Sequence, residues 1–210
     1  MTVTLSQSAQ KRYQIFLEDG LEGVKPIFFN TDMVQAVQAH TKTETRRKLK
    51  CSPPSTAYLH SVENGVIWSF WEDSDKQFIK VPYKAGDIMY VRETWTRGAD
   101  GSYLYKADCE DANVIWHPSI HMSRNAARIF LRVISIHAEK LQNITAEGLC
   151  SEGIRFDFER PTQSRRRFIK LWDSTIRSID LPIYGWAANP WVWVIRFEKI
   201  CKEEAFSILQ

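Results

Sequence analysis

The sequence has few cysteines: four among 210 residues, far apart and without C-x-x-C spacing. They are Cys51, Cys109, Cys150 and Cys201. This distribution suggests neither a zinc knuckle nor a disulfide framework. The best metal pattern is His117-x-x-x-His121, but Pro118 breaks the helix that would align the two histidines. We therefore expect no metal and no other cofactor.

Long apolar runs are also missing. The first 24 residues hold no apolar core of signal-peptide length, and no segment approaches the length of a membrane span. We expect a cytoplasmic protein without a membrane partner. The net charge of +3 is too small to identify a partner, so only local clusters of cations could form a nucleic-acid footprint. Nothing in the sequence indicates an oligomeric state.

Short apolar patterns without internal repeats predict many strands and few helices. Strands are expected at 25–29, 88–95, 102–107, 128–136 and 191–197, and helices at 31–40, 145–152 and 163–177. Residues 48–64 read as a loop, and 65–71 with 77–81 as a hairpin inserted into the domain. The fold class is therefore α+β: a small, mostly antiparallel β-barrel with peripheral helices.

Residues 41–50 concentrate lysines, arginines and threonines directly after the first expected helix. Lys42 and Thr45 are three residues apart, so one helical turn would place an ammonium and a hydroxyl on the same face. Arg46 and Arg47 would lie beside them to bind an anion. A hydroxyl next to an amine can act as a nucleophile with its base. By spacing alone, however, a cationic run after a helix is more often a solvated face.

Several segments in a fixed order carry a resemblance to a known family. They are K-T-E-T-R-R at 42–47, K-A-G-D-I-M-Y-V-R-E-T-W at 84–95, P-S-I-H-M-S-R-N-A-A-R-I-F-L-R-V at 118–133, L-Q-N-I-T-A-E-G-L-C-S-E-G-I at 141–154 and N-P-W-V-W-V-I-R-F-E at 189–198. Together they resemble the ASCH-domain proteins carried by bacteriophages and prophages, which belong to the PUA-like superfamily. The resemblance implies a PUA-like β-barrel with a cleft that family members use for RNA or nucleosides.

The resemblance also implies a division of the chain. Residues 1–24 would be an N-terminal extension, 25–198 the ASCH-like domain, and 199–210 a C-terminal tail. Within the domain, a hairpin near 57–81 and a helix near 163–177 would be insertions.

The family motif narrows the activity. The usual signature is Gly-x-Lys-x-x-Glu-x-Arg, in which Lys42 and Arg47 match while His40 replaces the Gly and Thr45 the Glu. The bacterial N4-acetylcytidine amidohydrolases are similar at this site, because they carry Lys-x-x-Thr-x-Arg. Their catalytic glutamate follows a threonine late in a helix, which corresponds here to Glu152.

The implied reaction is hydrolysis of the amide in N4-acylated cytosine nucleosides or bases. Thr45 would be the nucleophile and Lys42 its base, while Glu152 orients Lys42 or passes a proton to the leaving amine. Lys42 can act as a base only if burial or the neighbouring arginines lower its pKa, and a tight ion pair with Glu152 would argue against that role. Alternatively, Glu152 or Lys42 activates water and Thr45 only binds the substrate.

Five further residues are candidates for contacting the nucleoside or RNA partner: Arg46, Arg47, Arg92, Glu93 and His121. Arg92 and Glu93 are adjacent in an expected strand and point to opposite faces, so only one can readily face a cleft.

A binding function is the alternative from another class. An RNA-binding PUA-like module would contact phosphates through the basic loop and the cations of residues 165–170. Metal-dependent RNA cleavage ranks lower, because it needs clustered carboxylates and the acidic groups at 72–75 and 108–111 read as exposed turns.

Overall fold

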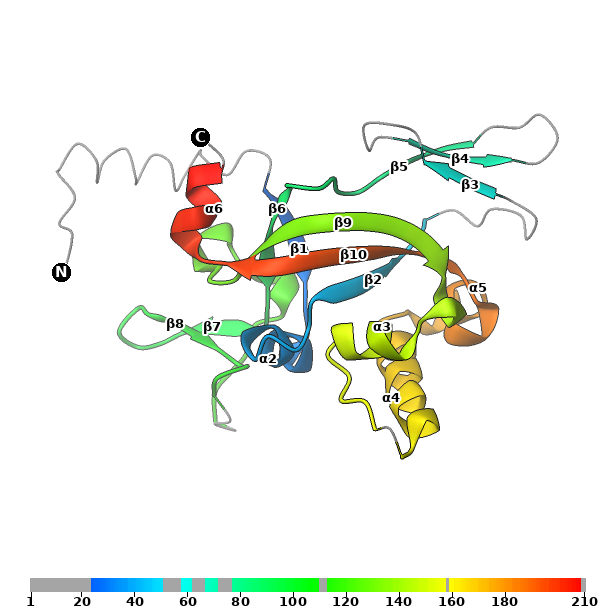
Figure 1. Cartoon of the computed structure of the whole chain (residues 1–210). Coiled ribbons are helices and arrows are strands. Elements are labelled where there is room, and N and C mark those ends of the chain that lie inside the picture. The colour runs from blue at the N-terminus through cyan, green and yellow to red at the C-terminus, as the bar shows by residue number, and fades with distance from the viewer. Residues whose placement is uncertain are drawn as a thin grey trace. The chain divides into compact units, whose positions relative to one another are not determined.

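The computed structural model describes residues 24–50, 58–61, 67–71, 77–109, 113–157 and 159–208 (Figure 1). The chain divides into two compact units. Of the described residues, the first unit holds 24–35, 87–132 and 199–208, and the second holds 36–50, 58–61, 67–71, 77–86, 133–157 and 159–198. No helix among these residues combines the length and the apolar composition needed to cross a bilayer.

The largest sheet among the described residues has five strands in the order β1-β6-β9-β10-β2. These are β1 (Lys25–Phe28), β6 (Ile88–Arg92), β9 (Phe130–Lys140), β10 (Trp191–Ile200) and β2 (Glu44–Lys48). β1 pairs with β6 in parallel, whereas β6 with β9 and β10 with β2 are antiparallel. The expected α+β class is confirmed. The expected barrel is not, because β1 and β2 remain edge strands within the described part of the chain.

The first unit is built around an apolar cluster that includes Ile88, Met122, Phe130 and Phe206. The expected strand 88–95 is divided into β6 and β7 (Trp95–Arg97), and β7 forms a hairpin with β8 (Tyr103–Tyr105). Helix α6 (Lys202–Ile208) lies in the segment interpreted as a tail and buries Phe206 in this cluster.

Helix α2 (Thr31–Gln38) begins where the sequence predicts, because Asn30 caps it: the Met33 N–H donates to Asn30 Oδ1 at 2.9 Å. The remaining short turns of the described residues are η1 (Ser119–His121), η2 (Arg124–Ala126), η3 (Leu141–Asn143), η4 (Ser178–Asp180) and η5 (Trp186–Ala188).

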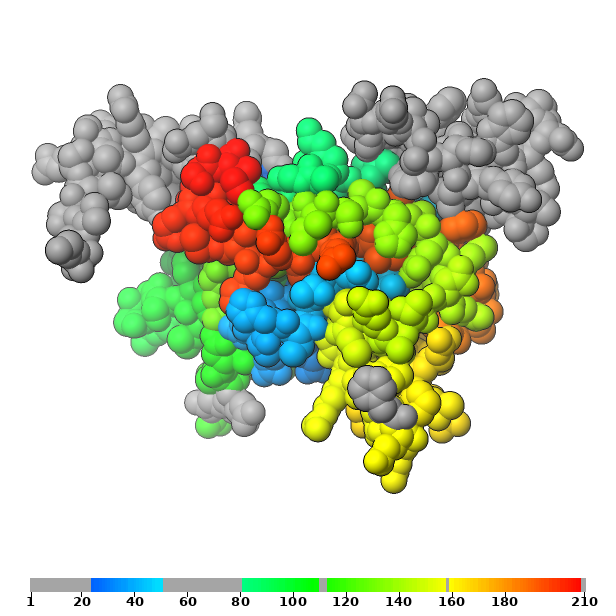
Figure 2. Space-filling model, viewed as in Figure 1, coloured from blue at the N-terminus to red at the C-terminus, as the bar shows by residue number. Residues whose placement is uncertain are grey.

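The second unit packs helices α3 (Ala146–Ser151), α4 (Pro161–Ser174) and α5 (Leu181–Tyr184) with strand β10. Its apolar cluster contains Leu149, Phe168, Trp172 and Val192. Trp172 Nε1 donates to the Tyr184 carbonyl at 2.8 Å, which ties α4 to α5. α3 and α4 contact each other and adjoin on the surface, in yellow-green and yellow in Figure 2. Both expected helices, 145–152 and 163–177, are confirmed.

A separate antiparallel sheet contains β3 (Tyr58–Ser61), β4 (Ile67–Trp71) and β5 (Gln77–Lys80). The expected hairpin is confirmed, with Ile67 opposite Lys80. The expected loop 48–64 is wrong where β3 lies, because β4 supplies a second pairing edge that local turn signals do not reveal. Residues 51–57 and 62–64 of that loop fall outside the described residues.

Candidate active site

The basic segment does not form the expected helical turn. Its central residues form β2, in which Thr45 lies opposite Ile195 and Arg47 opposite Trp193 of β10. Threonines at alternate positions suit an extended chain, and pairing with β10 outweighs the helical spacing. Lys42 and Thr45 therefore do not share a helix face. Instead, Lys42 forms an isolated β-bridge with Glu152.

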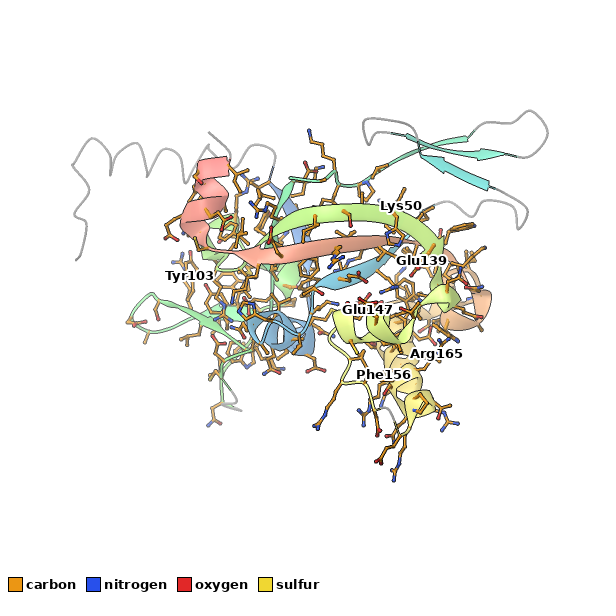
Figure 3. All side chains as sticks on the ribbon, in the orientation of Figure 1. Lys50, Tyr103, Glu139, Glu147, Phe156 and Arg165 are labelled. Atoms are coloured by element: carbon orange, nitrogen blue, oxygen red, sulfur yellow. The ribbon has the colours of Figure 1, made fainter. Side chains whose placement is uncertain are left out.

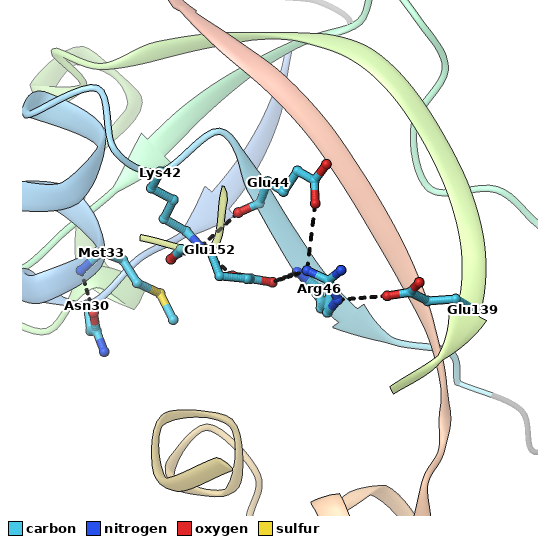
Figure 4. Close-up of polar contacts among 7 residues, drawn as sticks. All are labelled: Asn30, Met33, Lys42, Glu44, Arg46, Glu139 and Glu152. Carbon is cyan, nitrogen blue, oxygen red and sulfur yellow. Dashed lines mark hydrogen bonds and ion pairs between the residues drawn. The ribbon is translucent and has the colours of Figure 1, made fainter. Parts of the chain in front are cut away.

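The Lys42 side chain is 0% exposed, and its ammonium points at Glu152 (Figure 4). Lys42 Nζ donates to Glu152 Oε2 at 2.5 Å, to the Glu152 carbonyl at 3.1 Å and to the Glu44 carbonyl at 2.9 Å. An ammonium carries three N–H donors, and these acceptors satisfy all of them. The contacts therefore favour the protonated form of Lys42.

Glu152 stands at the C-cap of α3, where Gly153 ends the helix with φ of 86°. A Cβ at position 153 would lie 2.8 Å from Ala36 Cβ and 3.2 Å from Lys42 Cβ. Glycine is therefore required both for the left-handed conformation and for the close approach of Lys42. The N-cap Thr145, which accepts from the Gly148 N–H at 3.0 Å, fixes the other end of α3.

The second oxygen of Glu152 binds Arg46. Glu152 Oε1 accepts from the Arg46 backbone N–H at 2.7 Å and from Nη1 at 3.2 Å. Arg46 Nε also donates to Glu139 Oε1 at 2.8 Å, and Nη1 lies 3.8 Å from Glu44 Oε2 (Figure 4). Gly148 leaves room for the guanidinium, because a Cβ there would lie 2.9 Å from Arg46 Nη2. Sequence reasoning missed Glu139 and Glu44.

Opposing effects set the pKa of Lys42. Burial has the largest effect and lowers the pKa. The Glu152 carboxylate raises the pKa through its charge and its hydrogen bond, and the charges of Arg47 and Arg46 lower it. The net pKa of Lys42 lies below the ordinary lysine value. The tight ion pair that would oppose a base role is thus present, but burial outweighs it. Burial also lowers the pKa of Arg47, against the charges of Glu152 and Tyr83.

Thr45 is 1% exposed and precedes the Arg46 N–H that binds Glu152. Thr45 and Arg46 are consecutive in β2, so their side chains point to opposite faces of the strand, and a contact of the Thr45 hydroxyl with Lys42 or Glu152 stays a prediction. Lys42, Thr45, Arg46, Arg47 and Glu152 all belong to the second unit, and direct contacts join Lys42, Arg46 and Glu152.

The other three candidates, Arg92, Glu93 and His121, belong to the first unit. Glu93 is buried and accepts two hydrogen bonds of 2.9 Å from Arg128. Arg92 donates to the Ile120 carbonyl, and its guanidinium lies 5.1 Å from the centre of the Phe28 ring. His121 is exposed at the end of η1. Their role in substrate binding stays a prediction.

Within the described residues, no group of three or more His, Cys, Asp or Glu side chains is arranged to hold a metal ion.

His40 has φ of 57°, in the left-handed region that favours glycine. This is the position at which the ASCH signature has its glycine. His40 therefore adopts a backbone conformation that a glycine would adopt freely.

No family model and no curated protein matches the chain. Two solved structures do. One is a protein of Enterococcus faecalis V583 described by family-model DUF984, with 10% identity and a TM-score of 0.36, covering 91% of this chain and 94% of that one. The other is an ASCH domain of Lactobacillus crispatus JV V101, with 12% identity and a TM-score of 0.36, covering 92% and 96%. At these TM-scores the resemblance to ASCH proteins continues to rest on the sequence motifs.

Proposed function

We propose that the chain hydrolyses the amide of N4-acylated cytosine nucleosides or bases. The observation that carries the proposal is the buried 2.5 Å contact between Lys42 Nζ and Glu152 Oε2. It joins two residues 110 positions apart to which the family motif assigns catalytic roles. Perturbed lysines in contact with a carboxylate are typical of catalytic centres.

The steps balance with these residues alone. Lys42 passes a proton to Glu152 along their hydrogen bond, and the resulting amine takes the Thr45 hydroxyl proton as the oxygen attacks the acyl carbon. The C–N bond breaks, and Lys42 returns the proton to the departing N4 amine. Water then hydrolyses the acyl ester on Thr45 and releases the carboxylic acid. In the alternative route, water attacks the acyl carbon directly and Thr45 only binds the substrate.

The three proposed catalytic residues are buried. Lys42, Thr45 and Glu152 are each at most 4% exposed. The same burial that lowers the pKa of Lys42 also keeps water from it, so the substrate reaches these groups only after neighbouring side chains move apart.

The test is hydrolysis of a panel of N4-acylcytidines, followed by the ultraviolet change as cytidine forms. Lys42→Met, which keeps the side-chain length, is expected to lower turnover at least about 100-fold. Lys50→Met is the matched control, because Lys50 is an exposed lysine of the same basic segment and should leave turnover unchanged (Figure 3). Circular dichroism checks that both variants fold. No turnover by the unchanged protein, or full turnover by Lys42→Met, would refute the proposal.

Thr45→Ala separates the two routes. If Thr45 is the nucleophile, the variant loses turnover and a mass shift of one acyl group, trapped by acid quench in the unchanged protein, disappears. If water attacks directly, no acyl group is trapped and Thr45→Ala retains part of the turnover.

RNA binding is the second candidate, favoured by the exposed cations of α4, which are Arg165, Arg166, Arg167 and Lys170. A cavity of about 250 Å³ beside them is lined by Ala146, Leu149, Phe156, Pro161, Thr162 and Arg165. Phe156 and Arg165 are labelled in Figure 3. Cations next to an aromatic side chain are the usual means of holding single-stranded RNA.

Fluorescence anisotropy with a labelled single-stranded RNA tests this candidate. Replacing Arg166, Arg167 and Lys170 together by Gln is expected to weaken binding and to reduce its salt dependence. Binding that is unchanged by these substitutions would exclude α4 as the RNA-binding surface.

A further inference from the structure

Arg46 lies between two carboxylates from different elements. Its Nη1 donates to Glu152 Oε1 at 3.2 Å, and its Nε donates to Glu139 Oε1 at 2.8 Å. Glu152 caps α3, whereas Glu139 lies near the end of β9. The Arg46 side chain is only 4% exposed, so its guanidinium has little access to water and depends on these partners.

We infer that Glu139 is a positioning residue that controls the protonation of Lys42 by holding the Arg46 guanidinium. Neither the sequence motif nor the proposed reaction assigns a role to Glu139. The catalytic meaning of this inference rests on the proposed function, but the effect on Lys42 itself does not.

Glu152 is shared between two cations. Lys42 and Arg46 donate to different oxygens of this carboxylate: Lys42 Nζ to Oε2 at 2.5 Å, and Arg46 to Oε1 through Nη1 at 3.2 Å and through its backbone N–H at 2.7 Å. The bond to Glu139 draws the guanidinium toward β9 and compensates part of its charge. Glu152 Oε2 then remains bound to Lys42, and the charge and hydrogen bond of the carboxylate raise the pKa of Lys42 against the lowering by burial.

Loss of the Glu139 charge would act on Lys42 in two ways. The guanidinium, without its partner on β9, would bind Glu152 more tightly and weaken the bond to Lys42. Its uncompensated positive charge would also disfavour a second cation nearby. Both effects favour the neutral amine. Glu152 of α3 and Arg47 of β2 also act on Lys42 by charge.

Glu44 provides a matched control. It faces the same guanidinium but at 3.8 Å, against 2.8 Å for Glu139. The two carboxylate side chains are almost equally exposed, 19% for Glu44 and 20% for Glu139. Replacing either by Gln removes one negative charge and keeps the shape, and the Glu44 carbonyl that binds Lys42 Nζ is kept in Glu44→Gln, so the comparison tests the side-chain contact with Arg46.

The experiment is a pH titration of lysine side chains by NMR in the full chain labelled with ¹³Cε-lysine. The Lys42 signal is identified by its loss in Lys42→Met or, should that variant not fold, in Lys42→Arg. Glu139→Gln is expected to move the Lys42 titration to lower pH, and by more than Glu44→Gln does. An unmoved Lys42 titration, a shift to higher pH, or equal shifts in both variants would overturn the inference.

A double variant tests whether Glu139 acts through Arg46. In an Arg46→Gln background, Glu139→Gln should produce no further shift of Lys42. An undiminished shift would mean that Glu139 acts on Lys42 directly and would refute the positioning role. If Glu139→Gln fails to fold, Glu139→Asp replaces it. Asp keeps the charge but has a shorter side chain, so the Lys42 titration should move in the same direction by a smaller amount. An unmoved titration would contradict the positioning role.

The pH dependence of turnover links the result to catalysis. If the neutral amine of Lys42 is the base, turnover rises with pH as Lys42 loses its proton. In Glu139→Gln this rise in the pH–rate profile should move to lower pH together with the NMR titration. Absence of turnover in the unchanged protein would refute the proposed function, while the NMR comparison still decides the role of Glu139.

Discussion

Each unit of the chain contains an ion pair with a buried carboxylate, but only in the second unit is the cation buried as well. In the second unit, Lys42 and Glu152 are both buried, and burial lowers the pKa of the lysine amine. In the first unit the buried group is the Glu93 carboxylate, while its partner Arg128 is 25% exposed and lies 3.8 Å from the centre of the Tyr105 ring. Arg128 also pairs with Asp108.

The difference determines which of the two cations, Lys42 or Arg128, can lose its proton more easily. Burial lowers the pKa of Lys42, so its amine can become neutral. Burial also lowers the pKa of Arg128, but its hydrogen bonds to Glu93 and Asp108 outweigh this and raise the pKa above the usual value. A guanidinium does not act as a base in proteins. Of the two cations, Lys42 is therefore the one whose proton is more easily lost, whereas in the first unit the group that titrates more readily is the Glu93 carboxyl.

The largest effect is expected from Glu152→Gln. The variant leaves the fully buried Lys42 ammonium without its counter-charge, which should cost about 3–5 kcal/mol of unfolding free energy. Chemical denaturation measures the loss. Glu147→Gln is the control, because Glu147 lies on the same helix but is exposed, and it should cost less than about 1 kcal/mol (Figure 3). Equal costs for the two variants would show that the buried pair does not stabilise the fold.

Gly153→Ala should have the next largest effect, about 2 kcal/mol, from two sources. A methyl group at this position would contact Ala36 and Lys42 at less than normal distance, and φ of 86° disfavours any side chain. Gly86→Ala separates the sources, because Gly86 has φ of 88° but no atom within 4 Å of its added Cβ. Thermal unfolding measures the loss of stability in both variants. The loss in Gly153→Ala should exceed that in Gly86→Ala because Lys42 and Ala36 lie so close to position 153, and equal losses would contradict this explanation.

Much of the fold follows from local signals. The cap at Thr145 and the stop at Gly153 define α3 in the sequence, and they place Glu152 at the C-cap. The helix α4 and the strands β9 and β10 follow from apolar periodicity, although both strands run beyond their expected ends. The division of 88–95 into two strands and the helix α6 were missed, because neither has a strong periodic signal of its own.

The site was less predictable than the fold. Helical spacing predicted Lys42 and Thr45 on one helix face, and that prediction is wrong, since the segment is a strand paired with β10. The family motif, not spacing, selected Glu152. Glu139 could not be found, because β9 was expected to end at 136 and the approach to Arg46 depends on residues beyond that point. Such contacts between distant segments leave no trace in local sequence patterns.

The smallest effect, and the one that tests the contrast between the two centres, is expected from Glu93→Gln. Burial raises the pKa of Glu93 above 4.5, against the hydrogen bond and charge of Arg128, which lower it, and the charge of Asp108, which raises it further. The folded state therefore keeps this proton at pH values where the unfolded chain has lost it. The stability from this group is full below about pH 4.5 and is lost as the pH rises through the raised value.

Glu93→Gln removes that pH dependence, because Gln resembles the protonated carboxyl in shape and charge. The variant should change stability little in mild acid, and it should be more stable than the unchanged protein, by up to about 1 kcal/mol, once the pH has risen through the raised pKa of Glu93. Denaturation of both proteins between pH 4 and 8 measures the difference. Asp108→Asn, at an exposed carboxylate paired with the same guanidinium, should show no such trend. A cost for Glu93→Gln that grows with rising pH would mean that Arg128, not burial, dominates Glu93, and the contrast between the two centres would then rest on Lys42 alone.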